Sequence, residues 1–376
     1  MRHVVVSAIN LYAAGPLTIA REFLSAARDS AAFRRGEYRI TAFVHKASLF
    51  NDLRADGITY IEKPASRKNW LIRLFYEYVW FNRWSATQNV DTWVSLHDVS
   101  PNVKARRRMV YCHNPAIFYN GKSTLWTWRN DPKFELFRLF YARLYAANLH
   151  KNDRVIVQQQ WIRDEFAARF DYPPERIIVA RPDAIRPTQP PPAPNPSPSQ
   201  GVTLIYPAFP RFFKNHEVLV EAMKIIAAQP PPAGEVNLEL TMSGQENGYA
   251  KKIVGMAAGL RDIRFVGFLS HAQTLARYAH ADAMIFPSKL ETWGLPLSEF
   301  RETGKPIFAA DLPYAKEPLN DYPGVEWFDP DDAPALAERL RRFAQTRQVE
   351  AAPVHVEIKE PRADHWVELL RQLDLA

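Results

Sequence analysis

The sequence predicts an α/β protein of two domains, each built on a parallel sheet. Apolar strand-like segments alternate with helix-like segments along most of the chain, which is the order typical of parallel sheets with crossover helices. A proline-rich stretch at residues 187–200 separates two halves of nearly equal length. At 376 residues the chain is long enough for two cores of ordinary size. We therefore expect an N-terminal domain over residues 1–186 and a C-terminal domain over residues 201–360.

The expected strands of the first half are short apolar runs separated by helical spacing. They are His3–Ala8, Arg39–Val44, Asp91–Leu96, Arg107–Cys112, Arg154–Gln158 and Arg176–Ala180. Two aromatic-rich stretches with interspersed basic residues, Trp70–Trp84 and Leu125–Leu149, have helical spacing. Most of their aromatic side chains should lie in the core, and a minority on one face could contact a membrane surface.

The second half repeats this alternation. Its expected strands are Val202–Tyr206, Asn237–Met242, Ile263–Val266, Ala281–Phe286, Pro306–Ala309 and Gly324–Phe328. Residues 360–375 have the pattern of a closing amphipathic helix. Because doubly wound sheets bind ligands at the carboxyl ends of their strands, the polar residues that come after these strands are the candidates for a site.

Composition indicates a globular protein with 47% hydrophobic and 12% aromatic residues. The single cysteine, Cys112, excludes an internal disulfide and suits a reducing cytoplasm. The N-terminal apolar run is short and is interrupted by Asn10, so we interpret it as the first strand and not as a leader. No apolar stretch approaches the roughly 20 residues that span a bilayer, so any membrane contact should be peripheral.

Two glutamates near residue 290 form the most informative motif. Glu291 lies in the loop after an expected strand, and Glu299 lies in the next helix. Gly294 allows close approach of the backbone to a ligand, Pro296 suits a first helical turn, and amides around residues 293–297 favour a diphosphate. Carboxylates beside phosphates would repel them, so sugar hydroxyls are the better partners. A helix start carrying acids for its dipole explains one glutamate but hardly a pair.

Residues 265–313 resemble the retaining family-4 glycosyltransferases of the GT-B fold. That family has the pattern P-S-x-x-E-x-x-G-x-x-x-x-E, which is met by Pro287, Ser288, Glu291, Gly294 and Glu299. The resemblance implies two Rossmann-like domains facing a central cleft, with residues 361–376 bracing the N-terminal domain. It also implies that Glu291 contacts the hydroxyls of the donor sugar and Glu299 those of the ribose. Donor contacts extend to Thr292, Trp293 and Leu295; the family more often has Phe at position 293.

A basic pair lies after the first strand of the second domain. Arg211 and Lys214 precede an expected helix, and two cations at a strand's carboxyl end suit a diphosphate leaving group. The family places an Arg and a Lys in this loop for that purpose. Only two residues separate them here, a tighter spacing than many members show, so Lys214 is the first choice for the phosphate. Taken alone, a basic pair in a loop is more often solvated surface.

The first domain offers weaker candidates. His113 ends an expected strand where the family often has a histidine that touches donor sugar or acceptor, although histidine is also common as a structural group. His97 and Asp98 end the preceding strand and carry the same two interpretations. Gly15, in the segment after the first strand, takes the place of the family's small-residue loop. Only one glycine is present there, where two are frequent.

No metal or cofactor is expected beyond the nucleotide-sugar co-substrate. Asp329 and Asp331 match the metal-binding Asp-x-Asp of other glycosyltransferases, but they precede a helix near residue 333 and are more simply a turn with an N-cap. The sequence has no cluster of His and Cys with metal-ligand spacing. We therefore predict metal-independent chemistry.

Charge divides unevenly between the halves. Residues 1–186 hold 29 Lys and Arg against 17 Asp and Glu, a net charge of +12, whereas the remainder holds 19 against 24, a net charge of −5. A basic half suggests an anionic partner such as a membrane surface or a phosphate-bearing acceptor, or it serves solubility alone. Residues 106–108 add local positive charge beside a strand. No nucleic-acid-binding module is recognisable, so nucleic acid is not an expected partner.

The family resemblance, together with these observations, implies a retaining, metal-independent hexosyltransferase that acts on a glycan or lipid-linked saccharide in surface polysaccharide or lipopolysaccharide assembly. It would work in the cytoplasm or at the cytoplasmic face of the inner membrane. One alternative is a nucleotide-sugar epimerase of the same fold, which would turn over the donor without an acceptor. The other is a non-catalytic basic membrane-binding protein, which leaves the two glutamates and Lys214 without a purpose.

Overall fold

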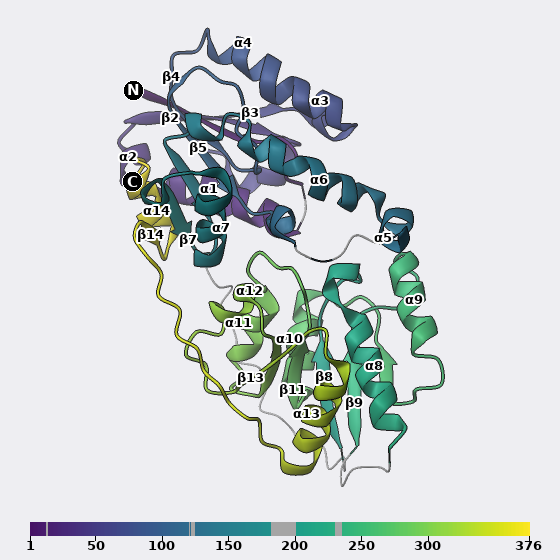
Figure 1. Ribbon diagram of the computed structural model, residues 1–376. Helices are drawn as coiled ribbons and strands as arrows, with labels where there is room; N and C mark the ends of the chain where they lie inside the picture. The colour runs from purple at the N-terminus through teal and green to yellow at the C-terminus, as the bar shows by residue number, and fades with distance from the viewer. Residues whose placement is uncertain (13, 120, 122–124, 182–200, 230–234) are drawn as a thin grey trace. The chain divides into compact units, whose positions relative to one another are not determined.

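The protein forms two compact units, each with its own parallel sheet (Figure 1). The computed structural model describes residues 1–376 except 13, 120, 122–124, 182–200 and 230–234. Unit 1 comprises Met1–Phe118, Leu136–Asp183 and Glu357–Ala376, and unit 2 comprises Tyr119–Glu135 and Ala184–Val356. The linker expected at residues 187–200 lies outside the described residues. Both sheets are parallel and carry helices, which confirms the predicted fold class.

Unit 1 contains an eight-stranded sheet in the order β14-β7-β6-β5-β4-β1-β2-β3, with every neighbouring pair parallel. The strands are β1 Arg2–Ala8, β2 Tyr38–Val44, β3 Ile58–Glu62, β4 Val90–Ser95, β5 Ala105–Cys112, β6 Arg154–Val157, β7 Ile177–Ala180 and β14 Arg362–Ala363. The six strands expected in this half are present. The sequence pattern missed β3 and β14, since β3 is an edge strand without buried residues and β14 has only two residues.

Helices cover both faces of this sheet. They are α1 Ala14–Asp29, α2 Ala31–Arg34, α3 Trp70–Phe75, α4 Phe81–Ser85, α6 Pro132–Ala146, α7 Gln160–Phe170 and α14 Trp366–Gln372, where α6 begins in unit 2. A π-helical turn at Tyr76–Trp80 joins α3 to α4. Side chains of β1 alternate between the two cores: Val4 and Val6 pack with α1, whereas Val5 packs with an aromatic cluster around Phe43 and Phe81. Parallel strands buried on both faces explain the continuous apolar runs.

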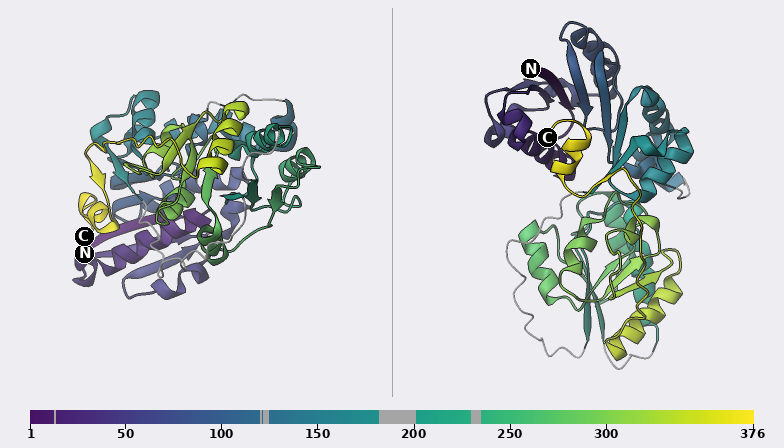
Figure 2. Two further views of the ribbon diagram at one scale, coloured as in Figure 1. Left: turned by 90° about the horizontal axis from the view of Figure 1, so that it is seen from below. Right: turned by 90° about the vertical axis from the view of Figure 1, so that its left-hand side faces the viewer.

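The C-terminal segment differs from the single helix expected over residues 360–375. Its first part instead extends the sheet: Val179 and Arg181 on the β7 side donate backbone hydrogen bonds to the carbonyls of Pro361 (3.1 Å) and Ala363 (3.2 Å). Pro361 cannot donate a helical hydrogen bond, so the helix starts later, at Trp366. Helix α14 then packs against α1 (Figure 2), with Leu369 among the residues buried in the same core.

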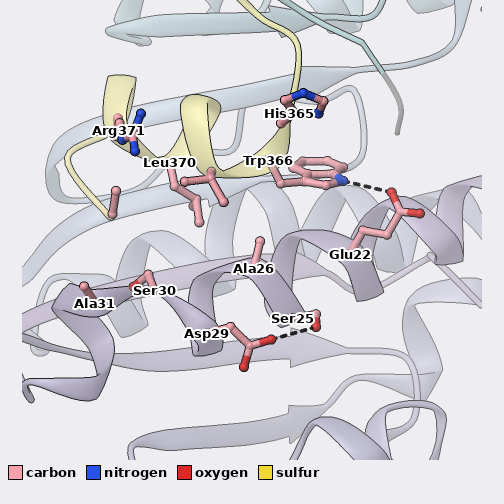
Figure 3. Close-up of a pocket in the computed structure, with 12 residues that line it drawn as sticks. Glu22, Ser25, Ala26, Asp29, Ser30, Ala31, His365, Trp366, Leu370 and Arg371 are labelled. Atoms are coloured by element: carbon pink, nitrogen blue, oxygen red, sulfur yellow. Dashed lines mark hydrogen bonds between the residues drawn. The ribbon is translucent and has the colours of Figure 1, made fainter. Parts of the chain in front are cut away.

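A groove of about 760 Å³ runs between α1 and α14 in unit 1 (Figure 3). The indole Nε1 of Trp366 donates a hydrogen bond to Glu22 (2.9 Å), and the hydroxyl of Ser25 donates one to Asp29 (3.4 Å). None of the predicted site residues lines this groove.

Unit 2 contains a six-stranded parallel sheet in the order β10-β9-β8-β11-β12-β13. Its strands are β8 Val202–Tyr206, β9 Val236–Leu240, β10 Ile263–Phe265, β11 Ala283–Phe286, β12 Ile307–Ala310 and β13 Val325–Phe328. Its helices are α5 Leu125–Asn130, α8 His216–Ala227, α9 Gly248–Met256, α10 His271–His280, α11 Leu295–Arg301, α12 Pro313–Lys316 and α13 Ala333–Thr346. All six expected strands are present, and β8 and β11 lie side by side at the centre of the sheet.

Across the described ranges, no helix has both the length and the apolar character that crossing a membrane requires.

Candidate functional site

The loops after β8 and β11 are joined at the carboxyl edge of the unit 2 sheet. Because these two strands are parallel neighbours, the segments after them emerge side by side. The backbone N–H of Lys289 donates to the carbonyl of Phe213 at 2.7 Å. The side-chain amide of Asn215 donates to the carbonyls of Pro287 (3.2 Å) and Pro330 (2.8 Å). Loops carrying two of the predicted residues are therefore fixed to each other by a backbone hydrogen bond and by the side chain of Asn215.

Lys214 and Glu291 form a direct ion pair across this junction. Their side chains are 18% and 14% exposed, so both groups are largely withdrawn from water but remain accessible. The hydroxyl of Tyr206 donates to the carbonyl of Lys214 at 2.8 Å. Burial, together with the charge of Glu291, raises the pKa of Tyr206 well above its usual value, so this hydroxyl keeps its proton. Lys214 and Glu291, which were predicted separately, thus lie in contact, and the backbone of Lys214 is held in place.

His216 begins α8 immediately beyond this loop. Its side chain is fully buried, and neither ring nitrogen has a hydrogen-bond partner within the described part of the chain. Burial, and then the charge of Lys214, lowers the pKa of His216 to about 3. The imidazole is therefore neutral at physiological pH, and the positive charge at this point of the sheet is that of Lys214.

Gly294 makes the turn between Glu291 and α11. It has φ +78°, and a Cβ atom there would lie 3.2 Å from Leu297 Cδ1, so a side chain would be strained. As expected, α11 begins at Leu295 with Pro296 in its first turn. The indole of Trp293 donates to Ser298 Oγ at 2.9 Å, which orients that ring over the helix start. Thr292 lies in the same turn.

Glu299 occupies the middle of α11 and has partners that the sequence did not indicate. Its Oε1 lies 3.0 Å from Nε2 of His271, and its Oε2 accepts a hydrogen bond from the hydroxyl of Tyr278 at 3.4 Å. Its side chain is 11% exposed, whereas that of His271 is 49% exposed. Both partners come from α10. Helical spacing predicts that α10 exists, but not that its first residue reaches a carboxylate 28 positions later.

Arg211 takes a different partner from Lys214. Its guanidinium lies 3.1 Å from Oδ2 of Asp131, and its side chain is half exposed. Asp131 belongs to the segment of residues 119–135 that groups with unit 2. The contact spans 80 positions, and no sequence motif signals it.

Unit 1 holds His113, which comes directly after β5. The carboxylate of Asp98 accepts hydrogen bonds from the backbone N–H groups of His113 (2.7 Å) and Asn114 (3.0 Å). Its other oxygen lies 3.6 Å from His113 Nε2, and the His113 side chain is 10% exposed. His97 is fully buried, which favours the structural interpretation for that residue.

The family resemblance implied a loop at Gly15, but the structure places this residue in a helix. It is the second residue of α1, because helical spacing extends back to Ala14. Apart from its chain neighbours and the backbone of its own helix, no described atom lies within 4 Å of the position that a Cβ atom would take at Gly15.

The Asp329–Asp331 segment forms a turn. The backbone N–H of Asp331 donates to Asp329 Oδ1 at 2.8 Å, and the Asp331 carboxylate pairs with Lys289. The N-cap of α13 is the next residue, Asp332, which accepts from the N–H of Ala335 at 2.9 Å. Over the described ranges, no group of three or more His, Cys, Asp or Glu residues is placed to hold a metal ion.

The region that holds the Lys214–Glu291 pair matches a known family. Residues 193–354 fit the model described as "Glycosyl transferases group 1". The glycogen synthase of Mycobacterium tuberculosis is 34% identical over 101 residues, which are 23% of this chain and 24% of that protein. This chain therefore matches only about a quarter of that relative's length. The matched residues include Lys214, Glu291 and Glu299.

Solved structures match over both units. The lipopolysaccharide outer core galactosyltransferase WaaB is 13% identical with a TM-score of 0.61, covering 92% of this chain and 90% of that one. The Anabaena protein Alr3699/HepE, solved in complex with UDP-glucose, is 14% identical with a TM-score of 0.58, covering 91% and 90%. At such identities the likeness concerns the fold, and it is the GT-B fold of two Rossmann-like units.

Proposed function

We propose that this protein transfers a sugar from a nucleotide-diphosphate sugar to a hydroxyl of an acceptor, with retention of anomeric configuration. The observation that carries the proposal is the partly buried Lys214–Glu291 pair at the junction of the β8 and β11 loops. A cation and a carboxylate side by side match a diphosphate and a sugar, the two parts of such a donor. The group 1 domain and the UDP-glucose complex of a structural neighbour support this choice.

The chemistry is set by the charges present. As the bond between sugar and diphosphate breaks, negative charge grows on the leaving phosphate, and Lys214 stabilises it. Glu291 accepts hydrogen bonds from sugar hydroxyls and so turns away from its present partner. Arg211 adds a second cation once it exchanges Asp131 for phosphate. The acceptor hydroxyl forms its bond to the anomeric carbon on the face that the diphosphate leaves, so the reaction needs no protein nucleophile. The leaving phosphate oxygen takes the acceptor's proton, so no separate general base is needed.

The identity of the donor, and the need for a metal, can be tested together. Incubation with a panel of nucleotide-diphosphate sugars should raise the Tm for one donor class, and nucleoside diphosphate should be released only when an acceptor glycan is added. Because Lys214 and Arg211 supply the cations, release should continue in excess EDTA. Product anomers, measured by NMR, should retain the donor's configuration.

Each other outcome contradicts part of the proposal. Loss of activity in EDTA that Mn²⁺ or Mg²⁺ restores would make Asp329 and Asp331 metal ligands. Conversion of the donor without an acceptor would indicate an epimerase. If no donor raised the Tm or released nucleoside diphosphate, the protein would be non-catalytic.

We further propose that the acceptor is lipid-linked and that unit 1 contacts an anionic membrane during surface polysaccharide assembly. Helices α3 and α6 pack together through Trp70, whose ring centroid lies 5.6 Å from that of Tyr141. This helix pair leaves several apolar side chains exposed, namely Trp70, Leu71, Phe75, Leu136, Leu139 and Phe140. The guanidinium of Arg143 lies over the ring of Phe140, so apolar and basic groups adjoin, as an anionic lipid surface requires.

A vesicle assay tests the membrane contact. The full-length protein should co-sediment with anionic vesicles at low salt, poorly with neutral ones, and less as salt rises. Leu71→Asp with Leu139→Asp should weaken the binding by roughly tenfold or more, because each removes an apolar group worth about 1.5–3 kcal/mol when buried. Val367→Asp is the control, since Val367 (54% exposed) is about as exposed as Leu139 (52%) but lies on α14. If the protein bound anionic and neutral vesicles equally, the positive charge of residues 1–186 would serve solubility and not membrane binding.

A further inference from the structure

A buried polar network lies at the carboxyl ends of β1, β4 and β5 in unit 1. Its members are Ser7, Arg73, Glu77, His97 and Asp98, and none is more than 8% exposed. Ser7 is in β1, the histidine and the aspartate come after β4, and the arginine and the glutamate come from α3 and its π-helical extension. The proposed transfer chemistry gives these residues no role.

Three members have the order of a hydroxyl–imidazole–carboxylate triad. His97 Nε2 lies 2.9 Å from Ser7 Oγ, and His97 Nδ1 lies 3.3 Å from Glu77 Oε1. All three side chains are fully buried, so no substrate carbonyl can reach the serine. Burial, and then the charge of Arg73, lowers the pKa of His97 well below its usual value, so the ring is neutral. The network is therefore structural support and not a second hydrolytic site.

The contacts of this network converge on the backbone turn at residues 97–98. Arg73 Nη2 donates to the His97 carbonyl at 2.9 Å, and Arg73 Nε lies 3.8 Å from Glu77 Oε1. Asp98 has φ +71°, a left-handed conformation that costs a non-glycine residue energy. Its N–H donates to the carbonyl of Tyr111 at 3.0 Å. Hydrogen bonds from Arg73 to the carbonyl of His97 and from Asp98 to the carbonyl of Tyr111 hold this unfavourable conformation. This support indicates that the position of the Asp98 carboxylate is important for the loop that it contacts.

That carboxylate clamps the start of the loop after β5 through the N–H groups of His113 and Asn114. We propose that Asp98, held in its left-handed turn by Arg73, is the positioning residue that fixes where the His113 imidazole meets the donor sugar or the acceptor. The inference rests on the proposed function and on the expectation, from the family resemblance, that His113 contacts substrate. Asp98 acts through His113. Replacing Asp98 should therefore change both the order of the loop after β5 and the rate of turnover.

Hydrogen exchange tests the clamp without any need for activity. In Asp98→Ala, the amides of His113 and Asn114 should exchange roughly tenfold faster or more, because both lose a charged acceptor. Asp98→Asn keeps an oxygen at the same place and should stay close to wild type. The matched control is Asp153→Ala. Asp153 Oδ2 accepts a hydrogen bond from the N–H of Arg108 (2.8 Å), which lies in β5, the strand that precedes His113. Unchanged exchange in Asp98→Ala, or equal acceleration in Asp98→Asn, overturns the proposal.

Kinetics test the link to His113. With a donor that wild type turns over, Asp98→Ala and His113→Ala should each lower kcat by roughly tenfold, with a smaller change in KM. The double variant should be no slower than His113→Ala, because Asp98 acts only through that ring. Multiplied losses in the double variant overturn the positioning role. If wild type turns over no nucleotide-sugar, the proposed function fails, whereas the exchange result still decides the clamp.

Discussion

Replacing Lys214 with alanine should lower kcat by roughly two orders of magnitude, because it removes a charged stabiliser of the leaving diphosphate worth ~3 kcal/mol. Its ammonium is mostly buried and lies against Glu291, so water replaces it poorly. Donor affinity should fall less than kcat, since the phosphate's charge grows as the bond breaks. Release of nucleoside diphosphate in single-turnover and steady-state assays gives both quantities.

The alanine variant also leaves Glu291 without its partner, and that carboxylate would repel the phosphates. Lys214→Ala with Glu291→Gln removes the repulsion and separates the two effects. The control is Lys289→Ala: Lys289 lies in the adjoining loop, but its ammonium pairs with the exposed Asp331. This control should keep wild-type kcat, since its bond to Phe213 is made by the backbone. Near-normal turnover in Lys214→Ala would remove the phosphate role from this lysine.

The placement of Lys214 and Glu291 in loops at the carboxyl ends of strands could be predicted from sequence because it depends on local signals, whereas their ion pair could not. Apolar strands such as Ala283–Phe286 end at turn-forming residues, here Pro287 and Ser288, and parallel topology brings their carboxyl ends to one edge. Gly294 and Pro296 then define the turn and the helix start. Glu291 follows the end of β11 by five positions and Lys214 follows the end of β8 by eight, so the two central strands bring both residues to the same edge of the sheet.

Long-range partners could not be predicted in this way. Asp131 joins Arg211 only because residues 119–135 group with unit 2, although they precede the expected domain boundary by more than fifty positions. The spacing of Arg73 and Glu77 predicts an ordinary exposed helix pair. The structure instead buries both, and they contact His97 after the end of β4. Hydrophobic periodicity predicts that a helix exists more reliably than it predicts which face of that helix is buried.

Glu299→Ala should weaken nucleoside diphosphate binding by roughly tenfold to a hundredfold, with a smaller change in kcat. The proposed partners are the two ribose hydroxyls, and a hydrogen bond to a charged acceptor contributes about 1.5–3 kcal/mol. Ribose does not react, so the loss is in binding and not in the transition state. Calorimetric titration with the donor's nucleoside diphosphate measures it.

His271 sharpens this test, because its imidazole Nε2 now lies 3.0 Å from the same carboxylate. Ribose must displace or share that contact, so His271→Ala should leave nucleotide affinity unchanged or raise it modestly. Lower affinity in His271→Ala would mean that the histidine itself binds the nucleotide. Tyr278→Phe is the second comparison: its hydroxyl is 3.4 Å from Glu299, and its loss should cost less than the loss of the carboxylate. If Glu299→Ala binds every nucleoside diphosphate as wild type does, the ribose lies elsewhere, and the carboxylate serves only to join α11 to α10.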